Sequence, residues 1–244
     1  MERTVSLTFK FRQYGVSFLL VHLAVGCSPS QPSSEDAPVT NAAAATGNVA
    51  APAGAPVEDA RLVVVFGDSL YAGYQLEREE GFAPALERNL AARGIAARVV
   101  NAGVSGDTSA GGRGRLAFVL DGLPRKPDLV VVGLGGNDML RGLDPAQTRA
   151  NLEAILTDLK ARGIPAMLTG MLAAPNMGSD YAARFNAIYP DLARAFDVPL
   201  YPFFLDGVIG DRALMLADGI HPNAQGVTAV TGRVAPLVVQ ALGD

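Results

Sequence analysis

Two runs of consecutive apolar residues constrain the fold of this chain more than any other feature. The run at 62–66 reads LVVVF and the run at 129–133 reads LVVVG, and neither alternates with polar residues. A strand that is apolar at every position is covered on both faces, which is the usual condition of a strand inside a parallel sheet. We therefore expect both runs to form central strands of a parallel sheet with helices on each face.

Apolar runs and amphipathic stretches alternate from residue 60 onward. The expected strands are 62–66, 97–101, 129–133, 166–170 and 199–202. The expected helices are 82–93, a stretch around 114–120, 145–162, 181–196 and 224–242. This order predicts an α/β fold, a three-layer α/β/α sandwich with a five-stranded parallel sheet, in one domain at 60–244.

The first 27 residues have the composition of an export signal. Three basic residues precede an uncharged, mostly apolar run at 14–25, which is too short to span a bilayer comfortably. The run ends in LAVGCS, which resembles a bacterial lipobox whose cysteine, here Cys27, becomes lipidated. We expect residues 1–27 to be a signal peptide with a lipobox. An ordinary signal peptide with an incidental cysteine, or a retained membrane anchor, are the alternatives.

Residues 28–59 are rich in Ala, Pro and Ser and contain no aromatic residue. Such a segment cannot bury enough apolar surface to offset the entropy lost on ordering, so we expect a disordered tether. The net charge of −4 provides no basic surface for nucleic acid. Because Cys27 is the only cysteine, no intramolecular disulfide is possible.

Polar residues follow the expected strands where each strand ends, as sites in open α/β sheets do. Ser69 follows the first strand in FGDSL. A serine is a weak nucleophile unless a base takes its proton, and His221 is the only histidine after the leader. Asp218 precedes it by three residues and could orient its imidazole. Asp68 is expected to brace the loop beside the nucleophile.

Attack on an ester also requires donors for the oxygen that becomes negatively charged. The backbone N–H groups of Ser69 and Gly103 and the side-chain amide of Asn137 are the candidates at three neighbouring strand ends. Each has a structural alternative, since Ser69 could begin a helix, Gly103 could form a turn and Asn137 could cap a helix. Their combination with a histidine favours a serine hydrolase.

These motifs resemble the four sequence blocks of the GDSL/SGNH hydrolases: GDSL with Ser69, NAGVSGDTS with Gly103, GGND with Asn137 and DGIHP with His221. GDSLYAGY, GGNDMLRGL and FDVPLYPFF further resemble the bacterial periplasmic thioesterase, lysophospholipase and arylesterase branch. The resemblance implies a flavodoxin-like sheet, a Ser69–His221–Asp218 triad, and oxyanion donors from Ser69, Gly103 and Asn137. It implies neither a metal nor a cofactor.

Apolar residues follow the third and fourth expected strands beside these polar groups. The candidates for binding an acyl chain are Met139, Leu140, Leu143, Met171, Leu172 and Met177. Residues of this kind on loops indicate a ligand groove, although they could also fill the core beneath the loops.

The expected function is that of a serine esterase acting on acyl esters, with acyl thioesters and lysophospholipids as further substrates. A carbohydrate O-deacetylase and a non-catalytic lipid- or ligand-binding lipoprotein are the alternatives. We expect an exported monomer on the periplasmic side of a bacterial membrane. Its partners would be a small acyl ester or lipid substrate and, through a lipid anchor on Cys27, the membrane, with no nucleic acid.

Overall fold

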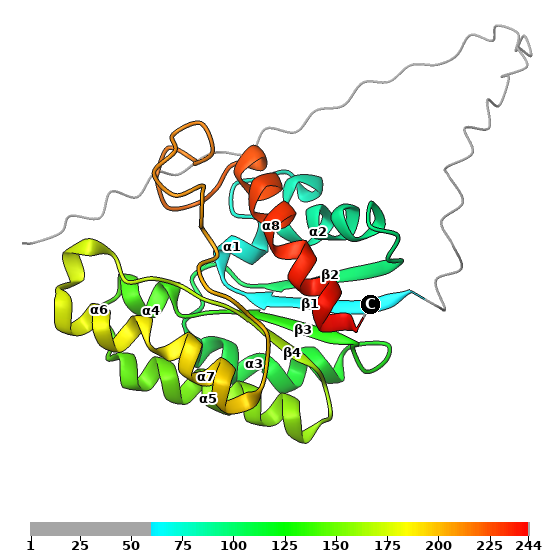
Figure 1. Cartoon of the computed structure of the whole chain (residues 1–244), viewed down its shortest axis with the longest axis horizontal. Coiled ribbons are helices and arrows are strands. Elements are labelled where there is room, and N and C mark those ends of the chain that lie inside the picture. Colours follow the sequence, from blue (N-terminus) through cyan, green and yellow to red (C-terminus); the bar gives the residue numbers. More distant parts are fainter. Residues whose placement is uncertain (1–59, 244) are drawn as a thin grey trace, which may run out of the picture. The chain divides into compact units, whose positions relative to one another are not determined.

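The computed structural model of the chain describes residues 60–243, in which one parallel sheet lies between helices (Figure 1). The strands are β1 (Arg61–Gly67), β2 (Ala97–Gly103), β3 (Leu129–Gly133), β4 (Ala166–Thr169) and β5 (Leu200–Tyr201). Their order in the sheet is β2-β1-β3-β4-β5, and every neighbouring pair is parallel. This is the flavodoxin-like order, so the predicted fold class is confirmed.

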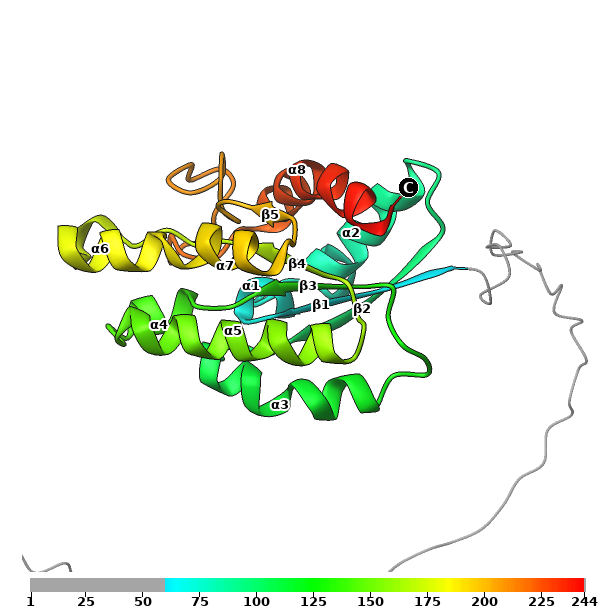
Figure 2. The same ribbon diagram turned by 60° about the horizontal axis from the view of Figure 1, so that its bottom comes forward.

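The longer helices are α2 (Phe82–Ala91), α3 (Ser109–Asp121), α5 (Pro145–Ala161), α6 (Ser179–Asn186), α7 (Ile188–Phe196) and α8 (Ala224–Leu242). The short ones are α1 (Ser69–Ala72), α4 (Gly136–Leu140) and the 3₁₀ turns η1 (Arg78–Glu80) and η2 (Pro175–Met177). Helices α2 and α8 lie on one side of the sheet, and α3 and α5 lie on the other (Figure 2).

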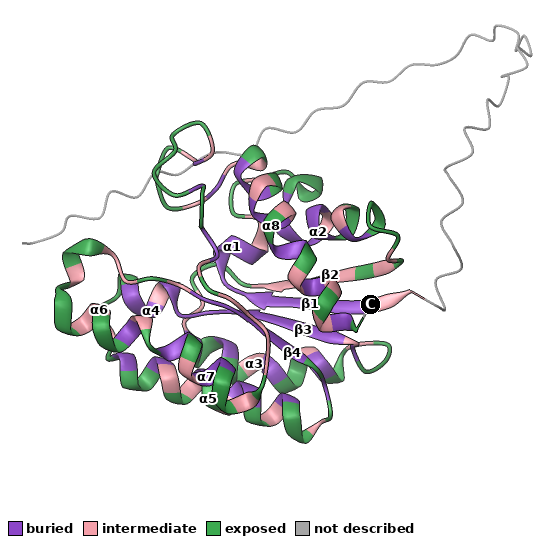
Figure 3. Ribbon diagram, viewed as in Figure 1, coloured by how far each residue is buried: buried purple, intermediate pink, exposed green. Residues whose placement is uncertain are grey.

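The core consists of two apolar clusters, one on each face of the sheet. Along β1, Val63 and Val65 belong to one cluster, whereas Val64 and Phe66 belong to the other. All four side chains are fully buried. Figure 3 shows β1, β3 and β4 buried and the edge strand β2 only half-buried. The uninterrupted apolar runs therefore mark central strands, as predicted.

The predicted helix at 181–196 is wrong in its continuity, because α6 ends at Asn186 and α7 begins at Ile188. Pro190 accounts for the break. In a continuous helix its missing N–H would have donated to the carbonyl of Asn186, and its ring would clash with that carbonyl. At the break, the side-chain oxygen of Asn186 accepts a hydrogen bond from the N–H of Ala173 at 2.8 Å.

The helix predicted around 114–120 is longer at its N-terminal end, since α3 begins at Ser109. The hydroxyl of Thr108 caps it by accepting the N–H of Gly111. A Cβ at Gly112 would lie 2.3 Å from Cδ1 of Leu134, so a glycine is needed where this helix approaches the core. Glycine has a poor helix propensity, which is why the first turns were not predicted.

The predicted signal peptide, lipobox and tether all lie outside the described residues. Within residues 60–243, no helix is both long enough and apolar enough to cross a membrane.

Candidate active site

Three glycines lie in register at the carboxyl ends of neighbouring strands, since Gly67 pairs with Gly103 on one side and with Gly133 on the other. A Cβ at Gly67 or Gly133 would lie 2.3 Å or 2.1 Å from the side chain of Tyr71. A Cβ at Gly103 would lie 2.4 Å from a backbone nitrogen of α1. The glycines therefore allow α1, which begins with Ser69, to fold back across the strand ends.

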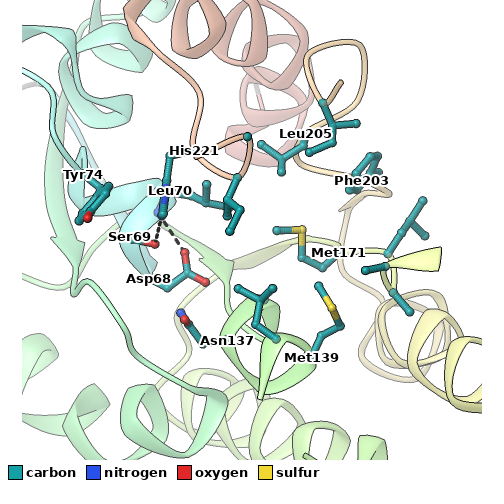
Figure 4. Close-up of a pocket in the computed structure, with 18 of the residues that line it drawn as sticks. Asp68, Ser69, Leu70, Tyr74, Asn137, Met139, Met171, Phe203, Leu205 and His221 are labelled. Atoms are coloured by element: carbon teal, nitrogen blue, oxygen red, sulfur yellow. Dashed lines mark hydrogen bonds between the residues drawn. The ribbon is translucent and has the colours of Figure 1, made fainter. Parts of the chain in front are cut away.

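Ser69, His221 and Asp218 form a continuous hydrogen-bonded chain. Ser69 Oγ lies 2.8 Å from His221 Nε2, and His221 Nδ1 lies 2.7 Å from Asp218 Oδ2. Figure 4 shows Ser69 and His221 pointing toward one another at one end of a pocket. The structure thus brings together the three residues that the sequence proposed as nucleophile, base and acid.

The loop between β5 and α8 holds His221 in place. Asp218 Oδ1 accepts the backbone N–H groups of Ile220 at 2.9 Å and His221 at 3.0 Å, which closes a tight turn. The backbone N–H of Leu216 donates to the carbonyl of His221 at 2.7 Å. On the other side, the ring of Tyr74 lies against the imidazole with the two centroids 4.4 Å apart. Both the position and the plane of the imidazole are therefore restrained.

The pKa values of the two carboxyl groups near the imidazole, Asp218 and Asp68, are shifted in opposite directions. Burial acts to raise the pKa of Asp218, but hydrogen bonds from the backbone N–H groups of His221 and Ile220 and from the imidazole outweigh it and lower the pKa to about 2. Burial raises the pKa of Asp68 to about 6, against a hydrogen bond from the N–H of Leu70. Asp218 is therefore ionised at neutral pH and suits the role of imidazole partner. Asp68 caps α1 through that bond, at 3.1 Å.

The structure places Asn137 at the pocket but not Gly103. Asn137 is in α4 at the end of β3, and its Nδ2 donates one hydrogen bond to the carbonyl of Asp107 at 2.9 Å. The N–H of Gly103 donates to Asn101 Oδ1 at 2.9 Å and does not line the pocket. Gly103 therefore does not fit the oxyanion role predicted for it, since its donor is already used.

The glycine that lines the pocket is Gly106, three residues further along the same motif. Its φ of +84° is one that favours glycine. The motif NAGVSGDTS contains both glycines, and spacing alone does not show which of them lies beyond the turn at the strand end. A preference for the glycine after the last apolar residue, Val104, would have selected the right one.

An apolar pocket of about 700 Å³ extends from Ser69 away from His221, and its volume is in the range of small-molecule sites. Met139, Leu140, Met171 and Leu172 line it, as expected from the sequence. Further apolar lining residues, which the sequence analysis missed, include Tyr74, Phe203, Leu205, Ile209 and Ile220.

Two of the predicted acyl-binding residues lie elsewhere, because neither Leu143 nor Met177 lines the pocket. Met177 packs against the apolar cluster on the α3 and α5 side of the sheet, which is the core-filling alternative. Among residues 60–243, no three His, Cys, Asp or Glu side chains are grouped as metal ligands would be.

A sequence model of the GDSL-like Lipase/Acylhydrolase family matches residues 65–229, which include every residue of the hydrogen-bonded chain. The chain belongs to the GDSL-like lipase/acylhydrolase family. This confirms the family predicted from the sequence, and the chain is a GDSL-type hydrolase.

Characterised relatives of this GDSL hydrolase lie in the predicted branch. This chain is 44% identical over 163 residues to the esterase TesA of Pseudomonas aeruginosa, and the match covers 67% of this chain and 80% of that protein. It is 42% identical over 161 residues to the thioesterase 1/protease 1/lysophospholipase L1 of Escherichia coli, covering 66% and 75%. A similar solved structure is that of AlinE4, an SGNH-hydrolase family esterase, with 48% identity, a TM-score of 0.65, and coverage of 75% and 97%.

Proposed function

We propose that this GDSL hydrolase is a serine esterase that cleaves acyl esters through a covalent acyl-enzyme on Ser69. The hydrogen-bonded chain from Ser69 through His221 to Asp218, at the end of an apolar pocket, is the observation that carries the proposal. A serine, an imidazole and an ionised carboxylate in this order are the parts that nucleophilic acyl transfer requires.

In the first half-reaction, His221 Nε2 takes the proton of Ser69 as Oγ bonds to the carbonyl carbon of the ester. The carboxylate of Asp218 accepts the Nδ1–H and stabilises the imidazolium. The C–O bond to the leaving group then breaks, and the imidazolium gives its proton to the departing alcohol. In the second half-reaction, a water gives a proton to His221 as its oxygen attacks the acyl carbon. The bond from that carbon to Ser69 Oγ then breaks, the imidazolium returns the proton to Oγ, and the acid is released.

The tetrahedral intermediate of each half-reaction carries a negative oxygen, which requires fixed donors. The amide of Asn137 has two N–H donors, and only one of them is used by the carbonyl of Asp107. The second is available to the oxyanion. We assign the remaining donors to the backbone N–H groups of Ser69 and Gly106, both of which line the pocket.

The pocket supports an acyl substrate. Its lining is mostly apolar on the side away from His221, where an acyl chain would extend from the carbonyl carbon (Figure 4). The relatives named esterase and thioesterase/lysophospholipase act on acyl groups by their names, which supports the same substrate class here.

We expect kcat/KM for p-nitrophenyl esters to rise from acetate to octanoate, by up to about fourfold per methylene, because each buried CH₂ contributes about 0.8 kcal/mol. The substitution Leu172→Glu places a charge in the pocket lining on a side chain that is 44% exposed, so the fold should tolerate it. It should lower kcat/KM for octanoate by roughly tenfold and leave acetate nearly unchanged. Initial rates across the ester series measure both effects.

Phe118→Glu is the matched control, since Phe118 is 83% exposed on α3 and does not line the pocket. It should leave the chain-length profile as in the wild type. A profile that peaks at acetate would contradict the acyl pocket and favour the O-deacetylase. Failure to hydrolyse any ester would favour the non-catalytic lipoprotein.

We also propose that the enzyme is exported and anchored by a lipid on Cys27, which rests on the sequence LAVGCS. In a bacterial host, Cys27→Ser should move esterase activity from the membrane pellet to the soluble fraction, with unchanged activity per molecule. Ser28→Ala, which keeps the cysteine, should stay in the pellet. Activity that remains in the pellet after Cys27→Ser would contradict lipid anchoring and indicate retention of the apolar segment.

A further inference from the structure

Arg115 lies on α3 and does not line the pocket, yet it contacts three segments that meet at the pocket. Its Nη2 donates to the carbonyl of Gly67 at 2.9 Å and its Nη1 to the carbonyl of Ala102 at 2.8 Å. Its Nε donates to Asp107 Oδ2 at 2.6 Å. The side chain is only 19% exposed, so these contacts are partly shielded from solvent.

Two of the three acceptors, Gly67 and Asp107, lie close in the chain to groups that we assign to the oxyanion hole. Gly67 ends β1, two residues before Ser69. Asp107 directly follows Gly106, and its own carbonyl accepts the side chain of Asn137 at 2.9 Å. The carbonyl of Gly67 also accepts the backbone N–H of the β2–α3 loop, at Val104, at 3.0 Å. One guanidinium therefore contacts the segments of Ser69 and Gly106 directly and reaches Asn137 through Asp107.

The local sequence is built around this guanidinium. Its carbon lies 4.1 Å from the centroid of the Phe66 ring, a stacking contact that restrains the guanidinium plane. A Cβ at Gly111 would lie 2.7 Å from Asp107 Oδ1, so the glycine leaves room for the carboxylate that Arg115 binds. A guanidinium has five donors in a planar fork, whereas a lysine ammonium is a single point charge on a flexible stem. A lysine at this position could not hold three separate acceptors in fixed directions.

We propose that Arg115 is a positioning residue of the oxyanion hole: it holds the segment of Gly106 and Asp107, and through Asp107 the amide of Asn137, where the developing oxyanion forms. This proposal rests on the proposed esterase function. Donors to an oxyanion act mainly in the transition state, so misplacing them lowers kcat and leaves KM nearly unchanged. Arg115 itself does not touch the substrate.

The test is steady-state kinetics of Arg115→Met and Arg115→Lys on p-nitrophenyl butyrate, with Arg113→Met as the control. Arg113 lies on the same helix, is exposed, and donates a hydrogen bond to the side chain of Asn151 at 3.4 Å. We expect Arg115→Met to lower kcat by about 30-fold with KM within about threefold, a fraction of the loss from removing a donor outright. Arg115→Lys should recover little of this loss, and Arg113→Met should match the wild type.

A double-mutant cycle with Asn137→Ala separates positioning from a general loss of stability. If Arg115 acts through Asn137, kcat of the double variant should fall by about 300-fold or less. Two independent losses of kcat, of about 30-fold and 100-fold, would instead multiply to roughly 3,000-fold. Circular dichroism and thermal unfolding establish that each variant is folded. If Arg115→Met does not fold, Arg115→Lys takes its place in the same cycle.

Three outcomes would overturn the proposal: a rise in KM at unchanged kcat, full additivity in the cycle, or wild-type kcat in Arg115→Lys. Ser69→Ala distinguishes the two levels of failure. If Ser69→Ala is inactive and the cycle is additive, only the role of Arg115 is wrong. If Ser69→Ala retains activity, the proposed function fails and the positioning role fails with it.

Discussion

Ser69→Ala and His221→Ala should each lower kcat for p-nitrophenyl butyrate by at least about 1,000-fold, while the fold stays intact. In the proposed mechanism Ser69 is the nucleophile and His221 its base, and the 2.8 Å contact between Ser69 Oγ and His221 Nε2 is short enough for direct proton transfer. The double variant should therefore be scarcely less active than either single variant. Burst-phase and steady-state kinetics on the purified protein measure this.

The control is Tyr74→Phe, which keeps the aromatic ring against His221 and removes only a hydroxyl that accepts a hydrogen bond from Gln75 Nε2. It should leave kcat within about threefold of the wild type, because the imidazole remains packed. Either single variant, Ser69→Ala or His221→Ala, retaining a tenth of wild-type kcat would rule out the proposed pair. A double variant whose loss equals the product of the single losses would show that the two residues act independently.

Asn137→Ala should lower kcat by about 100-fold to 1,000-fold and leave KM nearly unchanged. In the proposed mechanism the amide donates to the oxyanion, and removal of one such donor typically has an effect of this size. Asn137→Asp keeps the shape of the side chain but replaces the donor with a negative charge, so it should be at least as inactive. Binding of a phosphonate transition-state analogue should weaken in parallel, as judged from inhibition rates.

The matched control is Asn176→Ala, an exposed asparagine of η2 that does not line the pocket, and it should keep wild-type kcat. A rise in KM without loss of kcat in Asn137→Ala would assign Asn137 to ground-state binding instead. In that case, the oxyanion hole would consist of the backbone N–H groups of Ser69 and Gly106.

The sheet could be predicted from the sequence because its central strands are apolar on both faces. Val63 and Val64 point into opposite clusters, and both clusters require apolar side chains. The hydrogen-bonded chain could also be predicted, since only one histidine lies within residues 60–243 and an aspartate precedes it by three residues. A short-range pair of this kind does not depend on how distant loops fold.

The loops could not be predicted in the same way. Whether Gly103 or Gly106 lines the pocket depends on where β2 ends and how α1 packs over it, and neither is encoded in a periodic pattern. The loop that contributes Phe203, Leu205 and Ile209 contains no regular element, so hydrophobic periodicity says nothing about the direction of its side chains. Pro190 indicates a break in this helical stretch. Because it lies in the first turn of α7, where a helix tolerates proline, it did not show where the break falls.

Strand β1, which leads to Ser69, also separates this residue from the point where the chain enters the domain. β1 begins at Arg61, and its seven residues span about 23 Å at roughly 3.3 Å per residue before Ser69. Helix α8 starts just after His221 and runs back, so the C-terminal end of the domain lies near the beginning of β1 (Figure 1). The start of β1 and the end of α8 therefore both lie at the end of the sheet opposite Ser69. Attachment of the domain to a surface, a bead or a fusion partner through either end would leave the mouth of the pocket facing outward.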